Sequence, residues 1–355
     1  MSQQLEYVCD DSQEGQTLAA CLRQLLPGRT WAQVRQLVSS RRVRLGKLPG
    51  LNICQDPARR MHAGEYLLVT EHSAPPLPKA GALVIRHMDS QVVVVEKPAG
   101  IPTVRHPAER GWKDGRKELV PCLDDLVLAQ IRLQTGPGPR GPSGRLRIVH
   151  RIDKETSGLV VFARTVEAER SLGGQFRAHK VKRRYFAILV GRPENGIIRS
   201  FLVRDRGDGR RGSSIVAGVG KEAITHLEVI KRLGDGGPYQ NNRFTLVCCR
   251  LETGKTHQIR IHTSELGHPV AGDPVYMQPM AAPLMIDNSG APRLALHAAE
   301  LGFEHPATGA YVSWEMPLPP DLARLVEALG KNQRGPGRQG VWQEKEEDED
   351  EDPVA

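Results

Sequence analysis

Aromatic residues are scarce in this sequence: phenylalanine, tryptophan and tyrosine together make up only 5% of its 355 residues. Proteins that hold single-stranded nucleic acid without sequence preference rely on rows of stacked aromatic rings. We therefore do not expect a broad single-strand stacking platform.

Several other features are missing as well. The six cysteines form no C-x-x-C pair, so a zinc ribbon is not supported. No apolar run approaches the roughly 18 residues of a membrane span. The segment Met1–Glu6 has neither the basic nor the apolar region of a secretory leader. We expect a reduced cytoplasmic setting, no membrane association and a monomer.

The charge is strongly positive once its distribution is considered. The net charge of the whole chain is +8, but residues 344–355 hold eight acidic residues and one lysine. Without them, 48 basic residues stand against 33 acidic ones, a net charge of +15 for residues 1–343. A body this basic favours a polyanionic partner, most simply nucleic acid.

Residues 1–70 are predicted to form a small α+β module. Leucines at positions 18, 22, 25 and 26 share one helical face, and Thr30 with Gln33 fits a capping box for a second helix. A basic strand at 41–45 and a closing strand at 66–70 follow. This order resembles an S4 RNA-binding module, although a generic helical adaptor has similar periodicity. Its phosphate-facing edge would consist of Arg35, Arg41, Arg42 and Arg44.

A proline-rich linker is predicted at 71–82, followed by a larger domain at 83–330. The alternating strand and turn signals of that domain predict an α+β fold with a mixed, largely antiparallel sheet. Residues 136–145 and 205–220 have the composition of mobile loops, and 331–355 that of a disordered acidic tail. The expected helices are 122–134, 166–178, 256–266 and 321–329. The expected strands are 83–87, 92–96, 158–163, 184–190, 197–203, 223–232, 243–251, 295–304 and 311–315.

The most informative stretch is the run His150 to Ala163, HRIDKETSGLVVFA. It places Asp153 between two cations, ahead of a tight Thr-Ser-Gly turn and a continuously apolar strand. A carboxylate at the mouth of a buried strand can be held rigidly, as a functional group must be. On its own, the same pattern also fits an ordinary turn.

Four further segments are informative when they are taken together with this stretch. They are Val92–Gly100 (VVVVEKPAG), Lys182–Gly191 (KRRYFAILVG), Glu252–His262 (ETGKTHQIRIH), and Leu296–Ala299 with Phe303–Gly309 (LHAA and FEHPATG). With the Asp153 segment, they occur in the order and form of the motifs of the RluA family of pseudouridine synthases. The chain therefore resembles that family over roughly residues 92–309.

The resemblance implies an RNA isomerase that cuts the N1–C1′ bond of a uridine, turns the base and rejoins it through C5. It implies Asp153 as the catalytic carboxylate, acting as nucleophile or base, with Arg260 as its cationic partner. Tyr185 would stack on the base and act near the proton lost from C5. Arg151 would fill the stack that the flipped uridine leaves. Further RNA contacts are expected from His150, Lys255 and His257.

The resemblance requires no cofactor, because isomerisation has no net redox or energy input. The Gly254-Lys255-Thr256 run invites comparison with a phosphate loop, but that motif needs glycine at position 249, where this chain has Cys249. His257 and His262 are five residues apart, whereas two ligands on one helix face need a spacing of four, so we expect no metal.

Structured RNA is the expected partner. Large-subunit (23S) ribosomal RNA is the first expectation and tRNA the alternative, on family analogy. A non-catalytic RNA-binding or ribosome-assembly protein could share this fold. An Asp-dependent hydrolase would need a second carboxylate, for which Glu155 is the one sequence neighbour. Lys255 stands where the family has arginine, and a Gly-Trp-Lys insertion lies in the loop 104–119.

Overall fold

The computed structural model describes most of the chain outside its longest loops and its termini. The described residues are 5–46, 51–54, 56–70, 83–105, 107, 111, 121–135, 145–216, 218–234, 243–279 and 285–331. The predicted linker at 71–82, the tail beyond residue 331 and most of the 104–119 and 136–145 loops lie outside these residues. Within them, no helix is long and apolar enough to cross a bilayer.

The first 70 residues fold around their own small core. Helices α1 (Leu18–Leu25) and α2 (Trp31–Ser39) pack over a four-stranded sheet. The sheet has the order β1-β4-β2-β3, with strands β1 (Leu5–Val8), β2 (Val43–Gly46), β3 (Asn52–Ile53) and β4 (Tyr66–Val69). The predicted capping box is confirmed, because Thr30 accepts from the Gln33 amide and Gln33 from the Thr30 amide. The structure also contains strand β1 and a short 3-10 helix, η1 (Asp11–Gln13), which are not predicted from the sequence.

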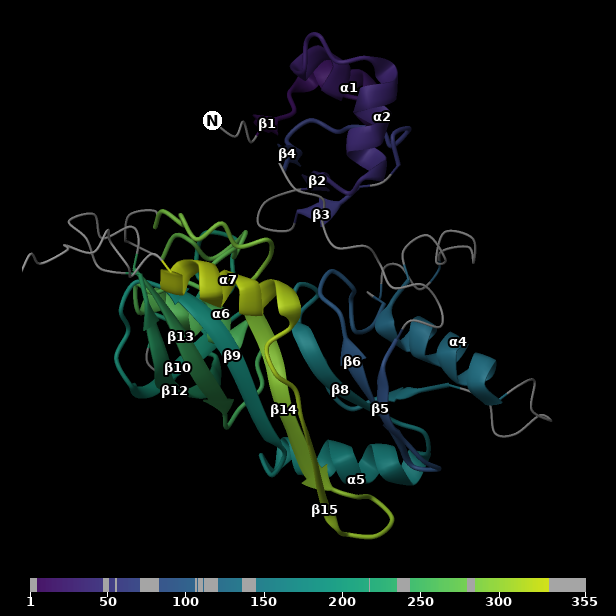
Figure 1. The fold of residues 1–355 in the computed structure, drawn as a ribbon, viewed down its shortest axis with the longest axis vertical. Coiled ribbons are helices and arrows are strands. Elements are labelled where there is room, and N and C mark those ends of the chain that lie inside the picture. The colour runs from purple at the N-terminus through teal and green to yellow at the C-terminus, as the bar shows by residue number, and fades with distance from the viewer. Residues whose placement is uncertain are drawn as a thin grey trace, which may run out of the picture.

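One 11-stranded sheet organises the rest of the described chain (Figure 1). Its main path runs β11-β10-β12-β13-β9-β14-β8-β6-β5, and β15 and β7 pair with β14 and β8. The strands are β5 (Ile85–Met88), β6 (Val92–Lys97), β7 (Arg147–Ile148), β8 (Ser157–Ala163), β9 (Lys182–Val190), β10 (Gly196–Val203), β11 (Gly212–Ser213), β12 (Lys221–Leu233), β13 (Phe244–Leu251), β14 (Leu296–Glu304) and β15 (Tyr311–Glu315).

All strand pairs in this sheet are antiparallel except β14 with β8, which are parallel at Ser157 and Gly158. The expected mixed, largely antiparallel sheet is therefore confirmed. Every predicted strand of this domain is present with small shifts at its ends, because apolar, β-branched runs bounded by turn residues carry a strong signal.

Helices cover both faces of the β6–β8 end of the sheet. Val93 and Val95 of β6 face the main core together with α4 (Leu123–Thr135), whereas Val92 and Val94 face α5 (Val166–Arg177). This division follows from the alternation of side chains along a strand. Strand β6 is apolar on both faces because both are covered.

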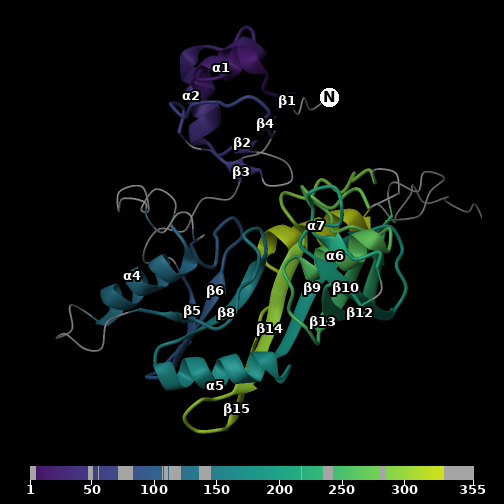
Figure 2. The same cartoon turned by 180° about the vertical axis from the view of Figure 1, so that it is seen from behind.

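Two further helices lie at the other end of the sheet from α5, as both views show (Figures 1 and 2). They are α6 (Gln258–Glu265) and α7 (Pro320–Lys331), close to the predicted ranges. Helix α7 contributes three leucines to the main core, at positions 322, 325 and 329.

The segment 205–220 differs from the mobile loop predicted from its glycines. It contains strand β11, which pairs with the end of β10. Ser213 donates through its backbone amide and its hydroxyl to the Glu265 carboxylate, at 2.8 and 2.5 Å. The aspartates of this segment also cap its turns, because Asp205 accepts from the amides of Gly207 and Gly209. Hydrogen bonds therefore order a stretch that contributes few apolar contacts.

Candidate active site

Asp153 lies in the short connection between β7 and β8, where β8 meets its parallel neighbour β14. The backbone amide of Thr156 donates to the carbonyl of Asp153 at 3.2 Å, which closes the turn. Gly158 follows with φ +125°, and a Cβ there would lie 2.1 Å from the Ala298 carbonyl oxygen. The glycine of the Thr-Ser-Gly sequence is thus required by the close approach of two strands.

A buried lysine anchors the loop that carries Asp153. Lys97, at the end of β6, is 1% exposed, and its Nζ donates to the carbonyls of Pro98, Ile101 and Lys154 at 2.8–2.9 Å. Burial lowers the pKa of Lys97 to about 7. Three carbonyl acceptors match the three hydrogens of an ammonium group. Lys97 and Gly100 are the first and last residues of the turn Lys97–Gly100, called the K-P-x-G turn below. Both contact the loop, because the Gly100 amide also donates to the Lys154 carbonyl.

Thr103 fixes the same loop one residue before Asp153. Its hydroxyl donates to the Ile152 carbonyl at 2.7 Å and accepts from the Ile152 amide at 3.2 Å. The backbone on both sides of Asp153 is therefore anchored to the segment 97–103. This arrangement leaves the carboxylate itself free to face the cleft.

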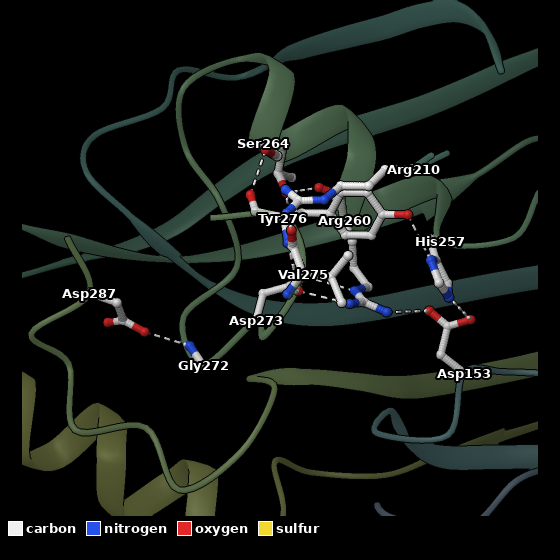
Figure 3. Close-up of polar contacts among 11 residues, drawn as sticks. Asp153, Arg210, His257, Arg260, Ser264, Gly272, Asp273, Val275, Tyr276 and Asp287 are labelled. Carbon is white, nitrogen blue, oxygen red and sulfur yellow. Dashed lines mark hydrogen bonds and ion pairs between the residues drawn. The ribbon is translucent and has the colours of Figure 1, made fainter. Parts of the chain in front are cut away.

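Arg260 links Asp153 to a second carboxylate (Figure 3). Its Nη1 lies 3.5 Å from Asp153 Oδ2, while its Nε and Nη2 donate to the two Asp273 oxygens at 2.7 Å each. Burial alone would lower the pKa of Arg260, but the Asp273 and Asp153 carboxylates outweigh it and raise that pKa. Burial likewise would raise the pKa of Asp273, yet Arg260 keeps it below its usual range.

The Asp273 carboxylate fixes the direction of the guanidinium, because both hydrogen bonds come from one edge of its plane. Asp273 also accepts from the amides of Val275 and Tyr276, which fixes the carboxylate in turn. The Tyr276 ring lies beneath the guanidinium, 4.9 Å from its carbon. Arg260 is thus held rigidly with one nitrogen directed at Asp153. The acidic residues nearest to Arg260 in sequence have other partners, since Glu252 pairs with His226 and Glu265 with Ser213.

His257 stands on the other side of the Asp153 carboxylate. Its Nδ1 is 2.8 Å from the Tyr276 hydroxyl and its Nε2 is 3.9 Å from Asp153 Oδ1. Burial lowers the pKa of His257, although Asp153 works in the opposite direction. His257 has a positive φ of 60° at the start of α6, a conformation that is costly for a residue with a side chain.

Tyr185 lies in the middle of β9 and is only 8% exposed. Burial raises the pKa of its hydroxyl; the nearby Arg183 opposes this and Asp153 adds to it. The tyrosine is therefore a neutral phenol with an apolar ring at neutral pH. It lines the same cleft as Asp153 and Arg260.

That cleft has a volume of about 680 Å³ and brings together the predicted residues of the larger domain. They are His150, Arg151, Asp153, Tyr185, Lys255, His257 and Arg260. Arg151 is exposed at the rim. His150 accepts the Val161 amide through Nε2, and burial lowers its pKa to about 3, so the ring is neutral. His150 also stacks on Phe176 at 4.6 Å, which makes it part of the cleft wall.

The four predicted arginines of the first 70 residues lie in different environments. Arg35 is exposed on α2 and Arg44 half-buried on β2, while Arg42 donates to the Thr70 carbonyl. Arg41 differs from the expected phosphate-facing edge, because it is only 8% exposed and its Nη2 lies 3.6 Å from where a Cβ on Gly100 would be. Arg41 thus faces the K-P-x-G turn of the larger domain.

His262 and His297, two buried histidines of the larger domain, have separate hydrogen-bond partners. His262 is fully buried between the Thr225 and Ser200 hydroxyls, and His297 contacts the Ser157 hydroxyl at 2.9 Å. Two other groups of possible metal ligands occur in the described part of the chain. They are His87 with Asp89 and His305, and Cys122 with Asp124 and Asp125.

The protonation of His305 argues against a metal in the first of these groups. Its Nδ1 accepts from the amides of Ala307 and Thr308 at 3.3 Å, so the proton of the neutral ring lies on Nε2. That Nε2 donates to Asp89 at 2.8 Å and has no lone pair for an ion. The group instead ties the β5–β6 turn to the β14–β15 turn.

Sequence reasoning missed Asp273, Tyr276 and Lys97 as parts of the site. Asp273 and Tyr276 follow a Gly-Asp-Pro turn that has the composition of an ordinary loop. The available signal was Lys97, a lysine that follows four valines and Glu96 at the end of a strand that such an apolar run would bury.

Comparison with known proteins agrees with this arrangement. Residues 91–265 match the family described as RNA pseudouridylate synthase. The chain is 36% identical over 325 residues to the ribosomal large subunit pseudouridine synthase D of Neisseria meningitidis serogroup A, covering 89% of this chain and 79% of that protein. It is 42% identical over 255 residues to the uncharacterized RNA pseudouridine synthase YlyB of Bacillus subtilis, covering 70% and 74%.

A solved structure supports the fold. The human RNA pseudouridylate synthase domain containing 4 has a TM-score of 0.51 and 24% identity, covering 69% of this chain and 92% of that one. The chain belongs to the RNA pseudouridine synthase family and is an isomerase that converts uridine in RNA into pseudouridine.

Proposed function

We propose that this enzyme acts on large-subunit (23S) ribosomal RNA. The observation that carries the proposal is the similarity to ribosomal large subunit pseudouridine synthases D along nearly the whole chain. The relative from Nitrosomonas europaea, for example, is 33% identical over 92% of this chain and 88% of its own length. The excess of basic residues over residues 1–343 suits such a polyanion.

The test is to map pseudouridine in three RNAs after incubation with the enzyme: a 23S transcript, partly assembled large subunits and bulk tRNA. Pseudouridine at defined positions of the 23S RNA, free or in the particle, is the expected result. Modification of tRNA alone would contradict the ribosomal assignment and leave the enzyme class intact.

In the proposed mechanism, Asp153 is the catalytic carboxylate. Its side chain is 17% exposed and faces the cleft, so it can reach a ribose while most of the group stays out of water. As nucleophile or base toward the sugar it must be ionised, and Arg260 at 3.5 Å stabilises that state. Asp273 prevents Arg260 from turning away.

The reaction balances without any cofactor. The N1–C1′ bond of the uridine breaks, the base turns, a C5–C1′ bond forms, C5 loses its proton and N1 gains one. The Tyr185 ring, which lines the cleft, would offer an apolar surface for the base, and its hydroxyl would act near the C5 proton. Arg151, exposed at the rim, would occupy the gap that the flipped uridine leaves. Lys255, His257 and His150 complete the RNA contacts of the cleft.

Residues 1–70 would serve as an S4-like RNA-binding module, followed by a linker at 71–82 and a catalytic domain at 83–330. The separate core of the first 70 residues supports this division. Arg35, Arg42 and Arg44 would contact phosphates. The acidic tail at 331–355 completes the proposed organisation.

We also propose a cytoplasmic monomer, because ribosomal RNA is made and modified in that compartment. Light scattering coupled to gel filtration should give a mass near 39.1 kDa. A dimer mass would contradict the monomer. Cell fractionation should recover the protein with ribosomal precursors, and recovery with membranes would count against the location.

A further inference from the structure

The cleft extends beyond Asp153 along the last turns of α5, into a region that the mechanism above does not use. This arm is lined by Gly173, Phe176, Arg177 and His179, with Arg183 from the start of β9. We propose that the arm binds a phosphodiester of the RNA strand that carries the target uridine, with Arg177 and His179 as the contacts. This inference rests on the RNA substrate of the proposed function.

The first observation is the charge of the arm. Arg177 and His179 are exposed, and Arg183 is half-buried beside them. The one acidic residue of α5 that lines the cleft, Glu169, pairs with Arg147 at 2.8 Å. No ion pair of Arg177 occurs among the described residues. The arm is therefore a cationic groove that adjoins the carboxylate site.

The second observation is how Arg177 is held. Gly173 and Gly174 lie inside the continuous helix α5, although glycine lowers helix stability relative to alanine. A Cβ on Gly173 would lie 3.3 Å from Arg177 Nη1, and one on Gly174 would lie 4.0 Å from Nη2. The guanidinium thus lies back over the two glycines, one turn earlier in the helix. Gly173 leaves room for the guanidinium there, whereas a Cβ on Gly174 would only be in ordinary contact with it.

The third observation is the backbone of His179. It follows the end of α5 with φ 59°, in the left-handed region that most helices fill with glycine at this position. The hydrogen bonds of a helix end are present, since the His179 and Lys180 amides donate to the carbonyls of Phe176 and Gln175. A side chain kept at a strained position, and lining a cleft, indicates a use for that side chain.

The wall behind these groups is rigid. The Phe176 ring stacks on His150, which precedes Asp153 by three residues in the chain. The Arg183 guanidinium lies 5.6 Å from the centre of the same Phe176 ring. Arg183 also donates to the Glu252 carbonyl at 3.0 Å. A phosphate held on the arm would therefore stand at a fixed distance from the uridine site, as base flipping requires a gripped backbone.

The test compares Arg177→Ala and His179→Gly with Arg170→Ala, which removes the same charge from the same helix outside the cleft. His179→Gly removes the side chain and relieves the backbone strain, so the variant should fold at least as well as the wild type. The probes are a large-subunit ribosomal RNA transcript and oligouridylate, titrated at several salt concentrations.

We expect Arg177→Ala to weaken RNA binding roughly tenfold, because a charge-assisted hydrogen bond is lost. Its plot of log affinity against log salt should be shallower by about 0.7–0.9. His179→Gly should weaken binding severalfold, and Arg170→Ala less than twofold. Oligouridylate with uncharged methylphosphonate linkages should bind wild type and Arg177→Ala equally.

Equal affinity and equal salt slopes for all three variants would overturn the proposal. A persistent difference on the uncharged probe would also overturn it, because the contact would then not be to phosphate. Both readouts measure binding alone. If the wild-type enzyme modifies no ribosomal RNA, the proposed substrate is wrong. The binding measurements still decide whether Arg177 contacts a phosphate.

Discussion

Arg260 interacts with two carboxylates at once. Its buried partner, Asp273, is therefore as important as its partly exposed partner, Asp153. Asp273 is fully buried and makes four hydrogen bonds, two of them to Arg260. Removing one member of a buried ion pair leaves the other charge without compensation. Asp153, in contrast, is partly exposed and contacts Arg260 more loosely at 3.5 Å.

We therefore predict opposite signatures for two conservative changes. Asp273→Asn should lower the free energy of unfolding by about 3–5 kcal/mol and reduce turnover. Asp153→Asn should abolish turnover with little change in that free energy. Urea denaturation and rate measurements on both variants check this. Equal stability loss in the two would show that Asp273 is not the structural anchor.

Gly158 offers a second prediction at the scale of one residue. Gly158→Ala should lower the free energy of unfolding by more than about 3 kcal/mol, because backbone strain of about 1–3 kcal/mol adds to a clash with Ala298. Gly309→Ala is the matched control, since Gly309 has φ +70° and nothing within 4 Å of a Cβ. Its cost should be only about 1–2 kcal/mol. Equal costs would mean that strand spacing at β8 and β14 adapts freely.

At the scale of elements, the strands and helices were largely predictable from sequence, whereas the tertiary partners were not. Strand β8 is buried at each of its positions and apolar from Leu159 to Ala163, and the start of α2 is marked by the capping residues Thr30 and Gln33. Strands of two residues such as β3, β7 and β11 carry no periodicity and were missed. Asp273 was missed because its pairing with α6 depends on a chain reversal that no local pattern encodes.

Helix α6 and strand β14 each bury a histidine that should govern acid stability. Burial lowers the pKa of His262 and of His297 to about 4, against about 6.5 in an unfolded chain. Between these values the unfolded state binds protons that the folded state does not, so stability falls as pH falls. It is fully present above pH of about 6.5.

His262→Asn should make the protein less sensitive to acid. Each buried histidine contributes about 1.4 kcal/mol per pH unit in this window, so the variant should lose about 2 kcal/mol less than wild type between pH 6.5 and 4.5. Urea midpoints across that range measure the difference. Parallel curves for the two proteins would show that His262 has the same pKa in the folded and the unfolded state.

At the scale of the whole molecule, the N-terminal module meets the larger domain at the first two segments of the motif series. Arg41 faces Gly100, and the Glu155 carboxylate opposes the lowering of the Arg41 pKa by burial. Arg35 lies exposed on the neighbouring helix. Composition predicts a basic module but cannot tell which arginines face outward, because burial depends on how the module meets the K-P-x-G turn.

We predict that Arg35→Ala weakens RNA binding and makes its salt dependence shallower, by about one phosphate contact. Arg41→Ala should leave the salt dependence unchanged and instead slow turnover, because the turn that supports the Asp153 loop loses its contact. Affinity titrations and single-turnover rates separate the two. A shallower salt slope for Arg41→Ala would return that residue to the RNA-facing edge. Deleting residues 1–80 should weaken binding more than either single change.

The most direct test of the central claim is tritium release from RNA labelled at C5 of uridine, with wild type and Asp153→Ala compared on 23S RNA, partly assembled large subunits and tRNA. Forming the C5–C1′ bond must expel that hydrogen. The account predicts release by wild type and none by Asp153→Ala, while both proteins bind RNA equally. Comparable release by the variant would contradict the role assigned to Asp153.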